Sequence, residues 1–79
     1  MLGRRMRILL IGATGLIGRE VGKRLALRGD TLVCLVRDVD RARRKLPFPA
    51  SCHAWDHTRE VPAAALRGVD AVINLAGEP

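Results

Sequence analysis

The sequence is organised around residues 12–18, Gly12-Ala13-Thr14-Gly15-Leu16-Ile17-Gly18. An apolar run at residues 7–11 precedes this stretch, and apolar residues spaced by four come after it at residues 16–28. Between a strand and a helix, the first glycine permits a tight turn, the second lets a pyrophosphate approach the backbone, and the third lets the helix pack closely on the sheet. The helix N–H groups and its positive dipole end then face the phosphates. We therefore predict that all seven residues bind a dinucleotide; the alternative is a plain turn with incidental glycines.

Three more apolar runs alternate with helical patterns along the chain. Continuous runs of branched residues are typical of strands covered on both faces, as in a parallel sheet. We expect strands at residues 7–11, 31–36, 51–56 and 70–76, helices at residues 16–28 and 39–46, and a brief helical or turn segment at residues 61–66. Right-handed crossovers place the strands in the order 3-2-1-4, with the third, of mixed polarity, at one edge. The sequence thus predicts an α/β fold, the N-terminal part of a Rossmann (doubly wound, parallel) sheet, with a crevice where the first and fourth strands end.

The expected helix at residues 16–28 carries two rows of residues spaced by four. One row is apolar and the other small, and we expect both to face the sheet: Ile17, Val21 and Leu25, and Gly18, Gly22 and Ala26. Gly29 is expected to end this helix, and Asp38 to cap the next one. The fourth expected strand, residues 70–76, has the composition of a buried strand.

The length of 79 residues suffices for one small domain. A complete doubly wound fold has two mononucleotide-binding halves, so we expect a truncated product or a fragment that holds one of them. Residues 1–5 are expected to be an N-terminal extension, and residues 6–79 a partial NAD(P)-binding domain. In such a fragment the fourth strand would form an unprotected apolar edge, from which we expect self-association.

The net charge of +6 bears on the class of partner. A small basic domain suggests nucleic acid. The arginines are dispersed, however, and with one Trp and one Phe there are no interleaved aromatic residues on which bases would stack. We therefore expect no nucleic-acid partner and keep a basic nucleic-acid-binding protein as the less favoured alternative.

Signals for export, membranes and metals are weak. Arg4-Arg5 and the apolar run after them resemble a signal peptide, but the glycines of residues 12–18 interrupt the apolar stretch. No run approaches the roughly 18 apolar residues of a membrane span. Cys34 and Cys52 lack the spacing of a zinc site or a disulfide scaffold and are interpreted as small buried hydrophobes. We expect a cytoplasmic protein with no membrane partner and no metal site.

The residues after the second expected strand bear on the choice of cofactor. NAD-selecting sites hold the ribose 2′-hydroxyl with an acidic side chain roughly 20 residues past the glycine motif. Here Arg37 stands nineteen residues after Gly18, and its guanidinium suits the 2′-phosphate of NADP. Asp38, the next residue, is interpreted as the helix cap. We predict NADP, with NAD as the alternative; a solvated surface role for Arg37 and a phosphate contact from Arg19 both stay open.

Three parts of the chain resemble known families. Residues 6–18 look like the opening of extended short-chain dehydrogenase/reductases, whose glycine motif is GxxGxxG. Residues 35–38, Leu-Val-Arg-Asp, are similar to the NADP-using members. Trp55-Asp56 and residues 72–79, Val-Ile-Asn-Leu-Ala-Gly-Glu-Pro, look like NAD-dependent epimerase/dehydratase-type proteins with a VINLAGEPI signature. The resemblance covers nearly the whole chain.

The resemblance implies further contacts with the cofactor. Asp56 matches a position that often faces the adenine. A loop beside the cofactor riboses is matched by Leu75, Ala76 and Gly77. Asn74 would be a structural residue in a buried strand, and neither His53 nor His57 matches a catalytic position.

The catalytic residues of the superfamily have no counterpart in this sequence. Its serine or threonine and its Tyr-x-x-x-Lys pair come after the fourth strand, and the chain contains no tyrosine. We therefore assign no catalytic residue. We expect an NADP(H)-binding N-terminal fragment of an epimerase/dehydratase-like oxidoreductase that is inert alone; the alternative is a non-catalytic dinucleotide sensor or binding module.

Overall fold

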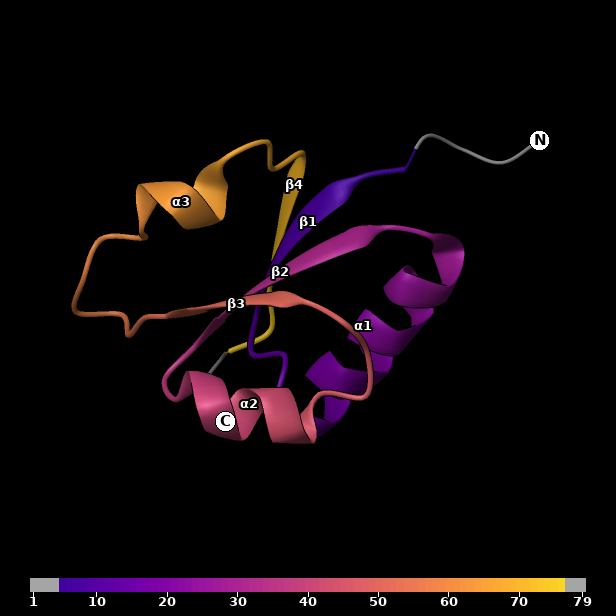
Figure 1. Ribbon diagram of the computed structural model, residues 1–79, viewed down its shortest axis with the longest axis horizontal. Helices are drawn as coiled ribbons and strands as arrows, with labels where there is room; N and C mark the ends of the chain where they lie inside the picture. Colours follow the sequence, from indigo (N-terminus) through magenta and orange to yellow (C-terminus); the bar gives the residue numbers. More distant parts are fainter. Residues whose placement is uncertain (1–4, 77–79) are drawn as a thin grey trace.

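The computed structural model describes residues 5–76, in which strands and helices alternate. In chain order they are β1 (Arg7–Ile11), α1 (Leu16–Arg28), β2 (Thr31–Val36), α2 (Val39–Lys45), β3 (Ser51–Ala54), α3 (Ala63–Leu66) and β4 (Ala71–Asn74). The paired strands are parallel, and their order across the sheet is β3-β2-β1-β4 (Figure 1). The predicted α/β fold and strand order 3-2-1-4 are therefore confirmed.

Helices cover both faces of the sheet, because successive side chains of a strand point to opposite sides. The even-numbered positions of β1 and β2 pack on the side of α1 and α2 and comprise Ile8, Leu10, Leu32, Cys34 and Val36. The odd-numbered positions pack against Ala65 of α3 and comprise Leu9, Val33 and Leu35. Figure 1 shows α3 on one side of the sheet and α1 and α2 on the other. The two central strands, β1 and β2, thus form most of the core. Because they are parallel, their carboxyl ends lie at the same edge of the sheet.

Helix α1 approaches the sheet through its small residues rather than through its first apolar one. Gly18 and Gly22 are buried, whereas Ile17 is 67% exposed. A methyl group on Gly18 would overlap the backbone of Gly12, and one on Gly22 would overlap the ring of Phe48. The expectation that Ile17 faces the sheet is wrong, because the glycine flank makes the close contact and turns this position outward.

The helix ends are explained by local capping. Gly29 takes a left-handed φ of 98° and ends α1. The Asp38 Oδ1 atom accepts a backbone N–H of the first turn of α2 at 3.0 Å. Both predicted caps are confirmed. Helix α2 ends at Lys45, one residue before the expected end, and α3 covers Ala63–Leu66 of the expected 61–66.

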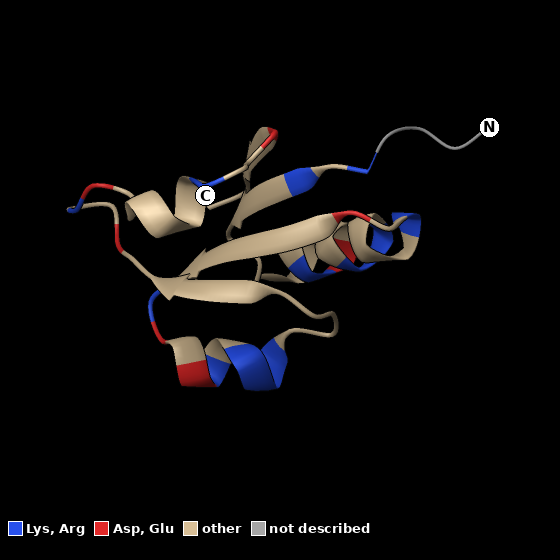
Figure 2. Ribbon diagram, turned by 45° about the horizontal axis from the view of Figure 1, so that its top comes forward, with Lys and Arg blue, Asp and Glu red and all other residues tan. Residues whose placement is uncertain are grey.

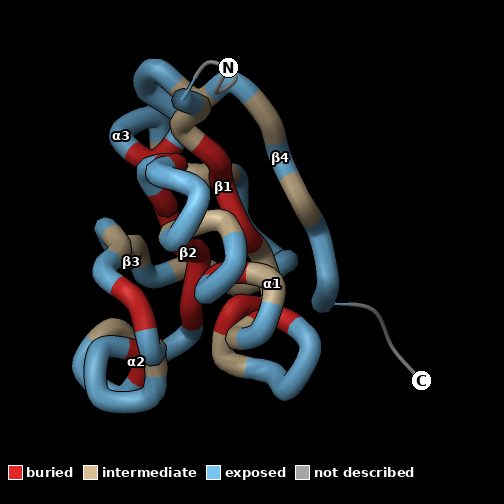
Figure 3. The backbone as a smooth tube through the Cα atoms, turned by 90° about the vertical axis from the view of Figure 1, so that its right-hand side faces the viewer, coloured by how far each residue is buried: buried red, intermediate tan, exposed pale blue. Residues whose placement is uncertain are grey.

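The two outer strands are shorter than the sequence predicts. Strand β3 ends at Ala54 instead of residue 56, and β4 covers Ala71–Asn74 of the expected 70–76. Val72 of β4 is 56% exposed, and Figure 3 shows the contrast between this strand and the buried β1 and β2. Among the described strands β1 is the one neighbour of β4, so β4 forms the unprotected edge expected of a fragment, and the burial expected in a complete sheet is not seen here.

Two carboxylates hold the beginning of β1. The Asp30 Oδ1 atom accepts the Met6 N–H at 3.0 Å, and the Asp70 Oδ2 atom accepts the Arg7 N–H at 2.8 Å. The Met6 hydrogen bond and the Arg28 guanidinium, 2.9 Å from Asp30 Oδ2, hold the pKa of Asp30 below its ordinary value of 3.8, against the opposing effect of burial. The loops that lead into β2 and β4 therefore fix the amino end of the central strand.

The two cysteines lie opposite each other on neighbouring strands, Cys34 on β2 and Cys52 on β3. Cys34 is buried and Cys52 partly buried, and both are free thiols. Burial raises the pKa of both, and that of Cys34 to about 12. The predicted burial is thus confirmed for Cys34 and holds in part for Cys52. Because the raised pKa values keep both thiols protonated, both are poor nucleophiles.

Two expectations concern the ends of the chain and the membrane. Residues 1–4 of the predicted N-terminal extension lie outside the described residues. Among the helices that the structure describes, none has the length and apolar character to cross a membrane.

Candidate functional site

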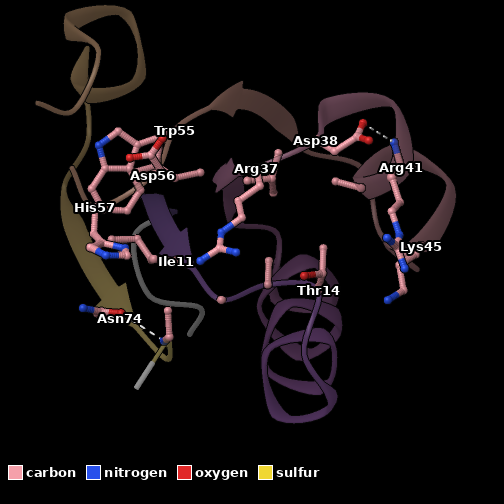
Figure 4. A pocket seen from close by; sticks show the side chains of 16 residues that line it. Ile11, Thr14, Arg37, Asp38, Arg41, Lys45, Trp55, Asp56, His57 and Asn74 are labelled. Carbon is pink, nitrogen blue, oxygen red and sulfur yellow. Dashed lines mark hydrogen bonds between the residues drawn. The ribbon is translucent and has the colours of Figure 1, made fainter. Parts of the chain in front are cut away.

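A cavity of about 550 Å³ opens at the carboxyl edge of the sheet, between the strand ends, the loops after them and α2 (Figure 4). Its volume is in the range of small-molecule and cofactor sites. Of the predicted cofactor contacts, those that line it are Gly12, Ala13, Thr14, Arg37, Asp56 and Ala76. The other described ones lie outside its lining and are Gly15, Leu16, Ile17, Gly18 and Leu75. Gly77 lies outside the described residues.

Gly12 makes the turn from β1 into the cavity wall. Its φ of 87° is in the left-handed region, which residues with a Cβ rarely adopt. An added Cβ would also lie 2.8 Å from the Ala76 nitrogen and 2.8 Å from the Leu75 carbonyl carbon. The loops after β1 and β4 therefore touch at a point where a glycine is required.

Gly15 precedes the first residue of α1 and leaves open space beside it. Its N–H donates to the Gly12 carbonyl at 3.2 Å. An added Cβ would meet that carbonyl oxygen at an ordinary 3.5 Å and no other non-neighbouring atom within 4 Å. Leu16 and Ile17 are 80% and 67% exposed, and no side chain caps the first turn of α1. This arrangement accords with the predicted approach of a pyrophosphate to the second glycine.

The two helices that begin at this edge, α1 and α2, differ in which groups accept hydrogen bonds from the backbone N–H groups of their first turns. The first N–H groups of a helix have no partner within it. In α2 the Asp38 carboxylate accepts one of them. In α1 the cap is Gly15, no side chain caps the turn, and no acidic residue lies in it. The start of α1 is therefore suited to an anion, which the helix dipole also favours.

Three cations line one side of the cavity. Arg37 comes directly after β2, and Arg41 and Lys45 project from α2. Figure 4 shows Arg37 between these two and the group formed by Trp55 and its neighbours, and Figure 2 shows how basic residues gather along α2. Within residues 5–76, no ion pair joins any of the three to an acidic side chain. This side of the cavity is suited to a phosphate.

The loop after β3 forms the opposite side, with Trp55, Asp56 and His57. The Trp55 Nε1–H donates to the Arg59 carbonyl at 2.9 Å. Asp56 Oδ1 accepts the Thr58 N–H at 2.9 Å and also the Thr58 hydroxyl. These two bonds hold the pKa of Asp56 below its ordinary value, so the carboxylate is charged at neutral pH. The loop is ordered by its own hydrogen bonds and presents an indole and an imidazole to the cavity.

The end of β4 completes the cavity. Asn74 is exposed, and its Oδ1 atom accepts the Ala76 N–H at 3.0 Å. The Leu75 N–H donates to the Ile11 carbonyl at 2.8 Å. The expectation of a buried Asn74 that ties the sheet together is wrong, because β4 lies at an edge and the side chain orders its own loop.

The lining residues that were not among the predicted contacts include two cations and two aromatic residues, Arg41, Lys45, Trp55 and His57. A signal for two of them was present, since Arg41 and Lys45 are spaced by four and a helix brings such residues to one face. Trp55 and His57 belong to a loop whose course the pattern of strands and helices does not specify. The described residues contain no group of three or more His, Cys, Asp or Glu that could hold a metal ion.

The cavity and the helix start beside it fit a dinucleotide. The turn at Gly12 and the uncapped start of α1, which follows the lining residue Thr14 in the chain, suit a pyrophosphate. The three cations suit an additional phosphate, and the aromatic loop suits a base. Arg19, in the first turn of α1, has a buried Nε atom without a hydrogen-bond partner among the described residues, and lies outside the cavity lining.

Comparison with known proteins adds a family and two relatives. The NAD dependent epimerase/dehydratase family matches residues 8–79. The photosystem II assembly factor Ycf39 of Synechocystis sp. is 34% identical over 72 residues, which cover 90% of this chain and 22% of that protein. The chain therefore spans about a fifth of the length of this relative.

The fold also matches a solved structure. A crystal structure of a protein from Lactobacillus casei is similar with a TM-score of 0.78 and 28% identity. The match covers 94% of this chain and 34% of that one. The parallel sheet and its glycine turn thus correspond to one part of longer proteins.

Proposed function

Because the chain belongs to the NAD dependent epimerase/dehydratase family, we propose that its cavity binds NADP(H) in preference to NAD(H). Membership makes the chain an NAD(P)-binding, oxidoreductase-like unit, and the proposal concerns which dinucleotide it selects. When bound, the nicotinamide would supply hydride transfer, and this part of the protein would supply grip and orientation.

The pyrophosphate would lie at the start of α1. The left-handed turn at Gly12, the open space beside Gly15 and the uncapped N–H groups of the first turn support this position. The Asp56 loop, with its aromatic residues, would receive the adenine. Thr14 lines the cavity between these parts and can donate its hydroxyl to a phosphate oxygen.

The observation that carries the preference for NADP is Arg37, which lines the cavity and forms no ion pair with an acidic side chain within residues 5–76. Arg37 occupies the position at which NAD-selecting sites carry an acidic residue. The next carboxylate along the chain, Asp38, accepts a helix N–H at 3.0 Å and caps α2. A guanidinium in this position pairs with a 2′-phosphate and has no comparable partner in the 2′-hydroxyl of NAD.

The single tryptophan offers a direct test, because Trp55 lines the cavity and a bound reduced nucleotide quenches its emission. We expect tighter binding of NADPH than of NADH. Arg37→Gln should raise the Kd for NADPH about tenfold or more and change the Kd for NADH by less than about twofold. Arg24→Gln, which removes an exposed arginine of α1 outside the cavity, is the control. Equal affinity of the unaltered chain for the two nucleotides would contradict the preference.

We further propose that the 79-residue chain does not catalyse a reaction on its own. The sequence holds no tyrosine, so it lacks the tyrosine of an acid-base pair. The same observation supports the second candidate, a dinucleotide sensor or binding module. The test is oxidation of NADPH with a panel of carbonyl compounds, and turnover that is abolished by Gly15→Ala would contradict an inert chain.

We also propose the extent of the domain and the cellular location of the chain. We take residues 6–79 as one cofactor-binding unit, supported by the family match over residues 8–79. A cytoplasmic location is supported by the two free thiols on neighbouring strands, which suit a reducing compartment. Cell fractionation with an antibody to the chain tests the location, and recovery in a membrane or exported fraction would contradict it.

A further inference from the structure

Cys34 and Cys52 form a pair of thiols that the proposed binding of a cofactor does not use. They are register partners on the neighbouring parallel strands β2 and β3. Neighbouring strands lie about 4.8 Å apart, which is within the range of Cα separations that a disulfide spans. Both side chains lie on the side of the sheet that α1 and α2 cover, since Cys34 belongs to the buried cluster there and Cys52 packs against it. A bond between the two sulfur atoms is therefore compatible with the spacing of the strands.

The two thiols differ in their surroundings. Cys34 is fully buried, whereas Cys52 is partly exposed. The Arg43 guanidinium of α2 lowers the pKa of Cys52, although burial outweighs this effect and raises the value on balance. Both burial and the neighbouring Cys52 raise the pKa of Cys34. Cys52 is therefore the thiol that a soluble reagent meets first, and Cys34 is placed to react with it in a second step.

We propose that Cys34 and Cys52 form a reversible redox pair, which a low-molecular-weight disulfide such as oxidised glutathione converts to an intrachain bond between β2 and β3. The Cys52 sulfur attacks the reagent, forms a mixed disulfide and releases one glutathione. The Cys34 sulfur then attacks the Cys52 sulfur and releases the second glutathione. Two protein thiols are thus oxidised, one disulfide of the reagent is reduced, and the two cysteine protons pass to the departing glutathione thiolates. Because both protein thiols are protonated at neutral pH, oxidation is slow, and the pair stays reduced in a reducing compartment.

The bond would strengthen the side of the sheet from which the aromatic loop continues. Strand β3 has four residues and, among the described strands, pairs with β2 alone. Arg37 follows Cys34 by three residues, Trp55 follows Cys52 by three, and both line the cavity. The bond would therefore join the two strands that lead to opposite sides of the cavity. Because the two cysteines are eighteen residues apart, it would also close a loop of the unfolded chain and raise the midpoint of thermal unfolding.

The test treats the chain with oxidised glutathione and follows its mass. We expect the unaltered chain to lose the mass of two hydrogen atoms, to carry no glutathione and to form no bond between chains on a non-reducing gel. Cys34→Ala, in which the second thiol is absent, should keep one glutathione on Cys52, whereas Cys52→Ala should stay unmodified over the same time. Arg43→Gln should slow the reaction about three- to fivefold. Its exposed neighbour provides the matched control, since Arg44→Gln loses the same charge and should change the rate less than about 1.5-fold.

The bond should also be reversible and stabilising. We expect oxidation to raise the midpoint of thermal unfolding by about 10 °C or more, and dithiothreitol to restore the original value. Thermal melts of the reduced variants establish that each one folds, and Cys34→Val serves if Cys34→Ala does not. A glutathione adduct that persists on the unaltered chain, a bond that forms only between chains, equal adducts in the two single variants, or a midpoint that does not rise would overturn the redox pair. These readouts do not depend on NADPH, so they are separate from the fluorescence titration that tests the proposed function.

Discussion

At the scale of single residues, Gly12 and Gly15 show two different requirements for glycine within one turn. Gly12 has a left-handed φ of 87° and backbone atoms 2.8 Å from where a Cβ would lie. Gly15 has an ordinary φ of −73° and open space beside it. The fold therefore requires the first glycine, whereas we attribute the second to the proposed binding of the cofactor phosphates.

Alanine substitutions separate these requirements. Gly12→Ala should lower the free energy of unfolding by about 1–3 kcal/mol, because the residue is strained and contacts the loop after β4. Gly15→Ala should change it by less than about 1 kcal/mol, since the cap residue keeps its conformation, yet weaken NADPH binding through the methyl group in the path of the phosphates. Denaturant titrations and NADPH titrations of both variants measure this. A destabilised Gly15→Ala, or a Gly12→Ala as stable as the unaltered chain, would contradict it.

Residue identity predicted part of the site. The turn at Gly12, the position of Arg37 and the capping role of Asp38 are set by short-range chemistry, and the structure has them in the cavity wall. Asn74 was misjudged, because its exposure depends on the neighbours of β4 and not on its own strand. The role of the Trp55 indole depends on a loop held by a hydrogen bond to a later carbonyl, which no local pattern indicates.

At the scale of elements, the central strand and the first helix are specified most fully by sequence. Strand β1 and helix α1 have the predicted bounds, since glycines mark both ends of the helix. The outer strands and α3 are shorter than predicted, because their ends depend on which neighbours extend the ladder. The inward position of Arg41 and Lys45 likewise requires the docking of α2, which periodicity alone leaves undetermined.

The beginning of β1 makes an element-level prediction about pH. The pKa of Asp30 is lowered in the folded chain, so its contribution to stability is present above its ordinary value of 3.8 and is lost as the pH falls through the lower folded value. Asp30→Asn should therefore be less stable than the unaltered chain at pH 7, and the difference should shrink below about pH 4. Denaturant unfolding across this range measures it. Glu60→Gln, in an exposed loop, is the control, and a difference that is constant with pH would contradict the role of the Asp30 charge.

At the scale of the whole molecule, β4 presents an open edge. Among the described strands it pairs with β1 on one side, and Val72 is 56% exposed. Edge strands of this kind associate with other strands. We propose that the chain self-associates through this edge, as its apolar sequence predicts.

A charge on the edge strand should weaken that association. Sedimentation velocity of the unaltered chain is expected to show larger species as concentration rises, and Val72→Lys should reduce them, since lysine on an edge strand opposes pairing. Leu27→Lys removes a more exposed apolar side chain from α1 and is the matched control, with no effect expected. A chain that stays monomeric at all concentrations would contradict the proposal.

The central claim is that the carboxyl edge of the sheet binds NADPH, and a nuclear magnetic resonance titration of the ¹⁵N-labelled chain tests it most directly. The largest shifts on addition of NADPH should fall on the backbone amides of Gly12, Thr14, Gly15 and Arg37, with smaller ones at Asp56. Shifts confined to the opposite edge, near Asp30 and Asp70, or no shifts at saturating nucleotide, would contradict the claim.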